Sequence, residues 1–178
     1  MKAAVVHLVG KIKYETVPDP TIMKFGKILI SAIIGTSAMT IFSYLVSASE
    51  NKNFREPEVL GHLIKRLPND DSKDGAQIAG WSLHYTVGFF FVALYNELWK
   101  RKKIKPSLAS GALLGAASGL AGITGWKGVF ELHPNPPAKN LKQFFGHLML
   151  AHVVFGVFSA LTYKLTVKEN KEAARQEG

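Results

Sequence analysis

The chain contains no cysteine among its 178 residues. This absence excludes disulfides, thiolate metal sites and cysteine nucleophiles. Acidic residues are also scarce, because 13 Asp and Glu stand against 22 Lys and Arg, a formal net charge of +9. In a soluble domain this charge would favour nucleic-acid binding. In a membrane protein the Lys and Arg of cytoplasmic loops account for it, so we expect no nucleic-acid partner.

Charge is absent altogether from four long stretches. The stretches have 22, 22, 21 and 20 residues and are Ile28–Ser49, Gly75–Asn96, Pro106–Trp126 and Phe144–Tyr163. A helix rises about 1.5 Å per residue, so about 20 apolar residues cross a hydrocarbon core of ~30 Å. Because backbone groups in lipid must pair within their own segment, each stretch is predicted to be helical. This pattern excludes a simple soluble enzyme domain and predicts that the chain lies in a lipid bilayer.

The predicted fold is an all-α membrane protein, an antiparallel bundle of four transmembrane helices with a short amphipathic outer-loop helix. The bundle occupies residues 27–166, with helices at about 27–49, 76–99, 106–127 and 144–166. A cytoplasmic leader precedes it at 1–26, and a cytoplasmic tail follows at 167–178. The short connection Lys100–Lys105 predicts that the second and third helices are antiparallel neighbours.

The outer-loop helix is predicted from the spacing of its apolar residues. They fall at helical intervals and are Val59, Leu60, Leu63, Ile64 and Leu67. Such a stripe is typical of a helix at the membrane interface and equally of a helix packed on the end of a bundle.

The distribution of basic residues predicts the orientation. Fourteen of the 22 Lys and Arg lie in residues 1–27, the Lys100–Lys105 connection and residues 164–178. Because cytoplasmic loops are enriched in Lys and Arg, both termini are expected in the cytoplasm. The simplest location for such a chain is a bacterial inner membrane.

The first residues carry a limited resemblance. Met1–Pro20, with the sequence MKAAVVHLVGKIKYETVPDP, contains two strand-prone segments around Gly10 and Lys11. It resembles the opening hairpin of the medium-chain zinc alcohol dehydrogenases. The resemblance ends after about twenty residues, and neither a cysteine ligand nor a strand-placed G-x-G-x-x-G follows. No zinc or nicotinamide site is therefore carried over, and the leader is predicted to be a hairpin or short cap.

Histidines are the principal candidate functional residues, because ionisable side chains inside a membrane are costly. His84 and His152 are expected at the same depth, on helix faces rich in small residues. They could bond only to neighbouring helices, or hold haem b or a divalent metal, with His147 a further metal ligand. His147 is expected near the interface, bonded to water. In a third interpretation His62, His133 and Glu131 respond to protons outside the membrane.

Glycines on the third helix predict close packing. Gly111, Gly115 and Gly119 form two successive G-x-x-x-G motifs, which Gly122 continues. Small residues let helix backbones approach closely in lipid. This face is expected to pack within the chain, with a homodimer interface as the alternative.

The sequence therefore predicts a non-enzymatic accessory, structural or stress-related membrane protein. Its partners are the bilayer and a second copy or another membrane protein. No cofactor is expected, with haem b or a divalent metal as the alternative. A small proton-responsive transporter is the third candidate. The chain contains no phosphate loop and no H-E-x-x-H motif.

Overall fold

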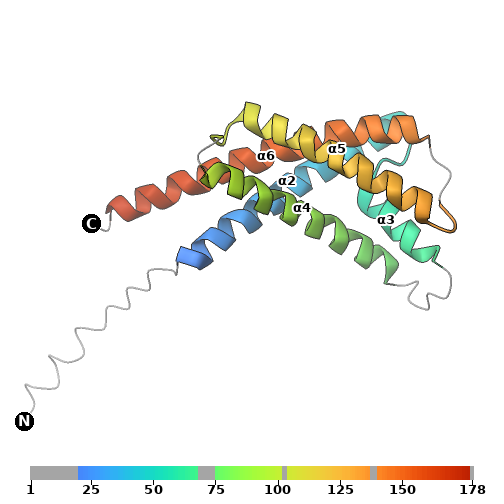
Figure 1. Cartoon of the computed structure of the whole chain (residues 1–178), viewed down its shortest axis with the longest axis horizontal. Coiled ribbons are helices and arrows are strands. Elements are labelled where there is room, and N and C mark those ends of the chain that lie inside the picture. The colour runs from blue at the N-terminus through green and yellow to red at the C-terminus, as the bar shows by residue number, and fades with distance from the viewer. Residues whose placement is uncertain (1–19, 68–74, 102–103, 137–139, 177–178) are drawn as a thin grey trace, which may run out of the picture.

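The computed structural model describes residues 20–67, 75–101, 104–136 and 140–176. These residues form five helices and no strand (Figure 1). The helices are α2 (Pro20–Glu50), α3 (Glu56–Lys65), α4 (Ala76–Lys100), α5 (Leu108–Leu132) and α6 (Leu141–Gln176). The hairpin predicted in the leader falls on residues 1–19, which lie outside the described part of the chain.

Four of the helices are long and apolar enough to cross a membrane. The spans are Lys24–Glu50, Ala76–Lys100, Leu108–Leu132 and Leu141–Lys168. Large apolar side chains point outward from them, and Ile78 and Leu113 are each 72% exposed. Such surfaces are stable against hydrocarbon rather than water. Length and composition thus indicate a membrane protein.

The helices extend beyond the charge-free stretches. α2 begins at Pro20 rather than near residue 27, and α6 continues to Gln176 rather than ending near residue 166. Charged residues are compatible with a helix that leaves the hydrocarbon, so the lack of charge marks the lipid-buried part only. α5 begins two residues later than predicted, because Ser107 is its N-cap and accepts a hydrogen bond from the Ser110 amide at 3.1 Å.

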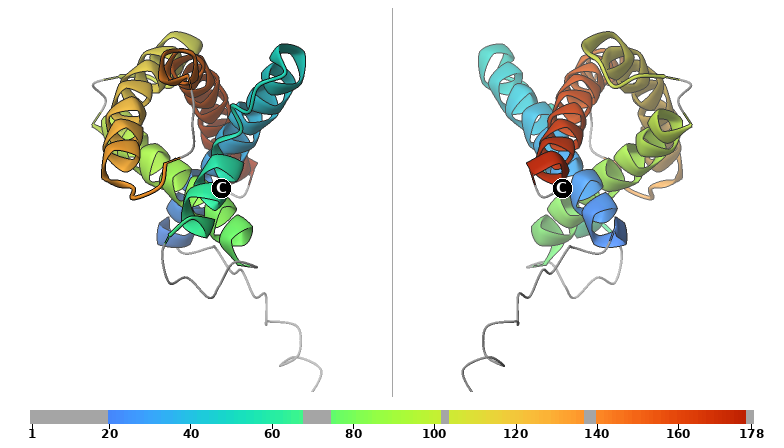
Figure 2. Two further views of the ribbon diagram at one scale, coloured as in Figure 1. Left: turned by 90° about the vertical axis from the view of Figure 1, so that its right-hand side faces the viewer. Right: turned by 90° about the vertical axis from the view of Figure 1, so that its left-hand side faces the viewer.

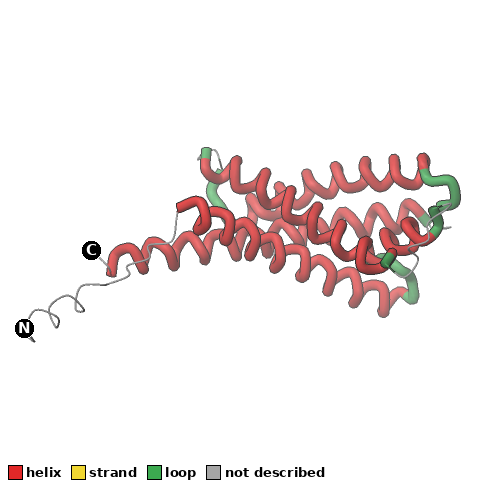
Figure 3. The backbone as a smooth tube through the Cα atoms, turned by 90° about the horizontal axis from the view of Figure 1, so that it is seen from below, coloured by secondary structure: helices red, strands yellow, loops and turns green. Residues whose placement is uncertain are grey.

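The long helices follow one another around a common axis in the order α5, α6, α2 and α4 (Figure 2). α3 packs on the first part of α4, where an added Cβ on Gly80 would lie 2.5 Å from the amide nitrogen of Gly61. The connecting loops gather at the two ends of the bundle (Figure 3). We refer to the end that carries α3 as the α3 end.

The short Lys100–Lys105 connection predicted that α4 and α5 are antiparallel neighbours, but the two helices do not pack along their whole length. They meet near that connection, where the hydroxyl of Tyr95 on α4 donates to the carbonyl of Leu114 on α5 at 2.9 Å. Beyond this contact α5 packs on α6, and α4 packs on α2 and α3. A short loop fixes only the ends that it joins, so the two helices can separate toward the α3 end.

The glycine face of α5 lies against α6. A Cβ on Gly111 would lie 2.6 Å from the carbonyl oxygen of Gly156, and one on Gly115 would overlap the backbone of His152. Gly119 faces Met149, and a Cβ on Gly122 would lie 3.1 Å from Nε2 of the His152 ring. α6 therefore occupies this face within one chain, and a dimer would need another surface.

Two glycines, Gly35 and Gly88, permit the close approach of α2 to its neighbours, and a buried hydroxyl faces each of them. Thr36 and Ser159 are 1% and 0% exposed, and neither hydroxyl has a hydrogen-bond partner. The Thr36 hydroxyl lies against Gly88 of α4, and the Ser159 hydroxyl lies against Gly35 of α2. At such crossings a glycine Cα–H can contact the hydroxyl oxygen, which partly replaces the missing hydrogen bond.

Candidate functional site

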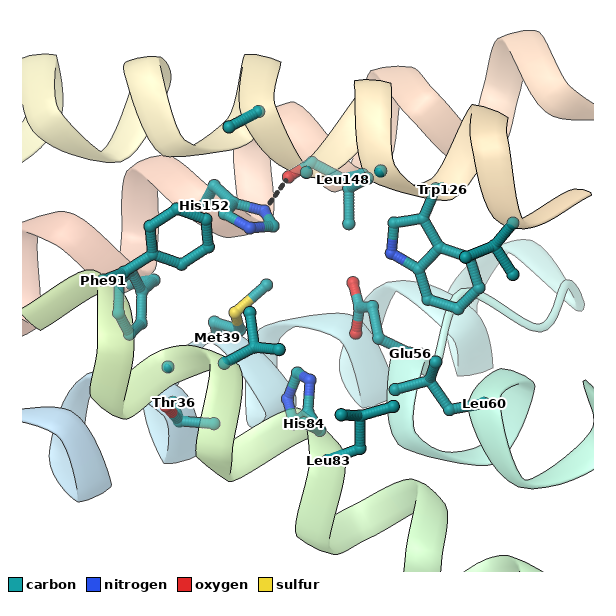
Figure 4. A pocket seen from close by; sticks show the side chains of 17 residues that line it. Thr36, Met39, Glu56, Leu60, Leu83, His84, Phe91, Trp126, Leu148 and His152 are labelled. Carbon is teal, nitrogen blue, oxygen red and sulfur yellow. Dashed lines mark hydrogen bonds between the residues drawn. The ribbon is translucent and has the colours of Figure 1, made fainter. Parts of the chain in front are cut away.

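A cavity of about 270 Å³ lies where α4 and α5 separate, with α3 at one side (Figure 4). Side chains from all five described helices line it. Its wall is mostly hydrocarbon and contains Met39, Leu60, Leu83, Val87, Gly88, Phe91, Ala121, Gly122, Gly125, Trp126, Val129, Leu148 and Phe155. The remaining lining residues are Thr36, Glu56, His84 and His152.

Three ionisable side chains therefore share one apolar cavity. Glu56 comes from α3, His84 from α4 and His152 from α6 (Figure 4). They are 2%, 8% and 7% exposed. Ionisable groups this deeply buried require hydrogen bonds or opposite charges. Their partners determine the chemistry of the cavity.

Glu56 belongs to a buried network with Ser43 and His147. The Ser43 hydroxyl donates to Glu56 Oε1 at 3.0 Å, and His147 Nε2 lies 2.9 Å from Ser43 Oγ and 3.9 Å from Glu56 Oε1. The His147 ring stacks between Phe42 and Phe54, at centroid distances of 5.3 and 4.6 Å. His147 is thus buried between helices and bonded to a side chain. The expectation that water alone would be the partner of His147 was wrong, because Ser43 bonds to it and α3 and the segment before it cover this position.

The partners of His84 determine which of its nitrogens carries hydrogen. His84 Nε2 lies 3.0 Å from Thr40 Oγ1, and the Thr40 hydroxyl donates to the carbonyl of Thr36 at 2.7 Å. The single hydroxyl hydrogen of Thr40 is therefore committed, so His84 Nε2–H must donate to Thr40. In a neutral imidazole the other nitrogen, Nδ1, is then an acceptor.

The hydrogen bond of His152 likewise determines which of its ring nitrogens carries hydrogen. Its Nδ1 lies 2.9 Å from the carbonyl oxygen of Leu148, one turn earlier on α6 (Figure 4). A carbonyl can only accept, so Nδ1–H donates, and Nε2 of the neutral ring is an acceptor. Nε2 lies on the side of the ring that faces Gly122. A larger residue at position 122 would push this ring.

The cavity reaches the outer surface between α4 and α5. Its rim consists of two rows at helical spacing, Leu83 and Val87 on α4 and Ala121, Gly125 and Val129 on α5. Each of these residues is exposed, so they do not close the cavity on this side. For a span embedded in a bilayer, an opening on this side faces lipid. The cavity is therefore accessible sideways.

The other predicted site residues lie apart from the cavity. His62 and Glu131 are exposed, and Glu131 lies 3.8 Å from Lys127. His133 is half-buried, with its Nε2 2.9 Å from the carbonyl of Leu63. Within residues 20–67, 75–101, 104–136 and 140–176, no three His, Asp or Glu side chains are grouped to hold a metal ion. His147 bonds to Ser43, while His84 and His152 line the cavity.

Sequence reasoning did not identify Glu56 or Ser43 as site residues. Glu56 lies just before the apolar residues from which the outer-loop helix was predicted. Its position was informative, however, because Glu56, Leu60 and Leu63 follow one helix face at intervals of four and three residues. An acid on the apolar side of an amphipathic helix is a candidate buried carboxyl. Nothing comparable marks Ser43 among the hydroxyl residues of α2.

No known protein family, curated protein or solved structure matches this chain. The cavity and the residues around it are therefore the features that bear on function.

Proposed function

We propose that this chain is a bacterial inner-membrane protein whose four long helices form an antiparallel transmembrane bundle. Both termini face the cytoplasm, and α3 lies on the opposite, non-cytoplasmic side of this membrane. The excess of Lys and Arg in the leader, the Lys100–Lys105 connection and the tail supports this orientation. Because the chain has no cysteine, single cysteines introduced at either end report the orientation by reaction with a membrane-impermeant maleimide. Outside labelling of the Lys100–Lys105 connection would contradict it.

Its role is non-enzymatic: the protein binds a small hydrophobic molecule taken from the bilayer, as an accessory carrier or sensor. The observation that carries this proposal is the cavity between α4 and α5. An apolar cavity of about 150 Å³ is enough to bind benzene. A cavity of about 270 Å³ can therefore hold a substituted aromatic ring or an equivalent aliphatic body.

The lining supports binding rather than catalysis. It consists mostly of hydrocarbon with a few polar groups, the usual composition of a ligand site. The polar groups are held by neighbours inside the protein, since Ser43 anchors Glu56 and Thr40 anchors His84. Such anchoring fixes their orientation before a ligand arrives, which favours affinity. The sideways opening gives a lipid-soluble molecule a path that avoids water.

Binding of 4-bromotoluene, an uncharged apolar probe, tests this function. Trp126 lines the cavity, and bromine quenches tryptophan fluorescence on contact. We expect saturable quenching with a dissociation constant of about 0.1–1 mM, which is reasonable for eight heavy atoms. The saturable part should disappear in Trp126→Phe, because Trp81 and Trp99 do not line the cavity.

A cavity-blocking pair of variants provides the control. A Cβ on Gly125 or on Gly128 would meet no atom within 4 Å, but only Gly125 lines the cavity. Gly125→Leu should therefore abolish saturable quenching, whereas Gly128→Leu should leave it unchanged. Quenching that rises linearly with probe in all variants would show simple partition into detergent and would exclude a binding site.

A haem or metal site using His84 and His152 is the second candidate. The observation that favours it is the acceptor nitrogen that hydrogen bonding leaves on each ring. An absorption spectrum and metal analysis of the purified protein distinguish it from the first. Stoichiometric haem or metal that is lost in His84→Ala and in His152→Ala would show that the site holds a cofactor and not a hydrophobic ligand.

A further inference from the structure

Two nitrogen atoms in the cavity wall are hydrogen-bond acceptors without a partner. In the neutral rings these are Nδ1 of His84 and Nε2 of His152, because the other nitrogen of each ring donates within the protein. Within the described part of the chain, no group donates to either of them. Protein atoms do not enclose either nitrogen completely. Both acceptors are therefore open to the cavity that the two rings line.

Trp126 adds one donor to the same space. Its indole nitrogen points into the cavity from α5 (Figure 4). An indole N–H can only donate, and among the described residues no group accepts from it. Glu56 is already bonded within the protein, where it accepts from Ser43, and the Thr36 hydroxyl is enclosed against Gly88. The two imidazoles and the indole are thus the polar groups that a ligand can engage.

A hydroxyl group matches this combination, because it donates one hydrogen bond and can accept another. An ammonium group can only donate, and a ketone or ether oxygen can only accept. A charged group would also lose its hydration on entering a cavity with a wall that is mostly hydrocarbon, and a neutral hydroxyl loses much less. The ligand is therefore expected to be uncharged and to carry a hydroxyl group.

The walls favour an aromatic body for this ligand. Phe91, Trp126 and Phe155 line the cavity from α4, α5 and α6. The rings of Phe91 and Phe155 already meet edge to face, with centroids 6.4 Å apart. Aromatic rings attract one another in edge-to-face and offset arrangements at centroid distances of about 4.5–7 Å. A ring bound in the cavity would extend this cluster.

We propose that the ligand is a lipid-soluble phenol, which packs its ring against Phe91 and Trp126 and donates its hydroxyl hydrogen to His84 or His152. The proposal rests on the proposed ligand-binding function and adds the chemical class of the ligand. The sideways opening admits such a molecule from lipid without a passage through water. The Trp126 N–H can donate to an oxygen of the ligand.

Three matched probes test the class on the unmodified protein at pH 7. They are 4-bromophenol, which is mostly neutral at this pH, 4-bromoanisole, in which a methyl group replaces the hydroxyl hydrogen, and 4-bromotoluene, in which a methyl group replaces the hydroxyl. Each dissociation constant is corrected for the partition of that probe into the same micelles without protein. A hydrogen bond between neutral groups corresponds to about a threefold to tenfold gain in affinity. We therefore expect 4-bromophenol to quench Trp126 with a dissociation constant at least about threefold below that of either other probe.

His84→Phe and His152→Phe remove the acceptor nitrogens and keep an aromatic ring of similar shape. Neither substitution leaves a buried donor without a partner, because the Thr40 hydroxyl donates to Thr36 and the Leu148 carbonyl only accepts. At least one of the two variants should bring the 4-bromophenol and 4-bromoanisole constants to within about 1.5-fold of each other. His62→Phe is the matched control, because His62 is exposed and does not line the cavity. It should preserve the full preference for the phenol.

The outcomes separate the class of ligand from the existence of the site. If 4-bromotoluene binds saturably and 4-bromophenol binds no tighter than 4-bromoanisole, the phenol proposal is overturned and the cavity function stands. A preference that survives in both His84→Phe and His152→Phe also overturns it, since the hydroxyl would then bond elsewhere. If no probe binds saturably, both proposals fail. The comparison of probes needs no variant, so it decides the class even if a substituted chain does not fold.

Discussion

Gly115→Val is expected to separate α5 from α6 and to lower the free energy of unfolding by about 3 kcal/mol. A Cβ at this position would overlap the backbone of His152 and lie 2.9 Å from the Cα of Val153. Backbone atoms cannot move aside as a flexible side chain can, so the helices themselves must shift. Thermal unfolding in detergent measures the loss.

The control is the same substitution on the same helix at an open position. A Cβ on Gly128 would have no atom within 4 Å, so Gly128→Val carries the same change in helix propensity without the clash. We expect this variant to differ from the parent by less than about 1 kcal/mol. Equal loss in both variants would show that the cost arises from valine in a helix, and would contradict the tight contact between α5 and α6.

Ser43→Ala is expected to produce an effect of similar size, a loss of about 2–4 kcal/mol in the free energy of unfolding. Ser43 donates to Glu56 and accepts from His147 with one hydroxyl, and it is itself fully buried. Its removal leaves two buried polar groups without that partner. Each such group costs about 1–3 kcal/mol when it is left unsatisfied.

Ser49→Ala provides the comparison for this loss. Ser49 lies on the same helix, is exposed, and bonds only to the carbonyl of Val46 at 3.0 Å. The variant should stay within about 0.5 kcal/mol of the parent. If Ser43→Ala were equally mild, the Glu56–Ser43–His147 network would not contribute to stability, and the anchoring of Glu56 would have to be abandoned.

The four long helices could be predicted from the sequence because hydrocarbon excludes charge at every position of a span. That rule acts locally, so the absence of charge between residues 28 and 49 was enough to locate α2. The ends of the helices depend on other interactions. Ser107 caps α5 through its side chain, and α6 continues past Lys168 where charge is permitted in water.

The cavity was only partly predictable. The small residues beside His84 and His152 indicated that both rings face inward, and both line the cavity. The cavity itself arises because α4 and α5 separate beyond Tyr95, which depends on how α5 packs on α6 and α4 packs on α2 and α3. Helix length and apolar spacing contain no information about that separation. The burial of Glu56 likewise depends on where α3 docks.

The central claim is that the space between α4 and α5 is a ligand site. Crystals of the full chain soaked with 4-bromotoluene test it most directly, because anomalous diffraction locates bromine without reference to any model of binding. We predict one strong bromine peak inside the cavity, near Trp126 and Phe91. Bromine found only on the lipid-facing surface, for example beside Leu113 or Ile78, with an empty cavity, would contradict the account.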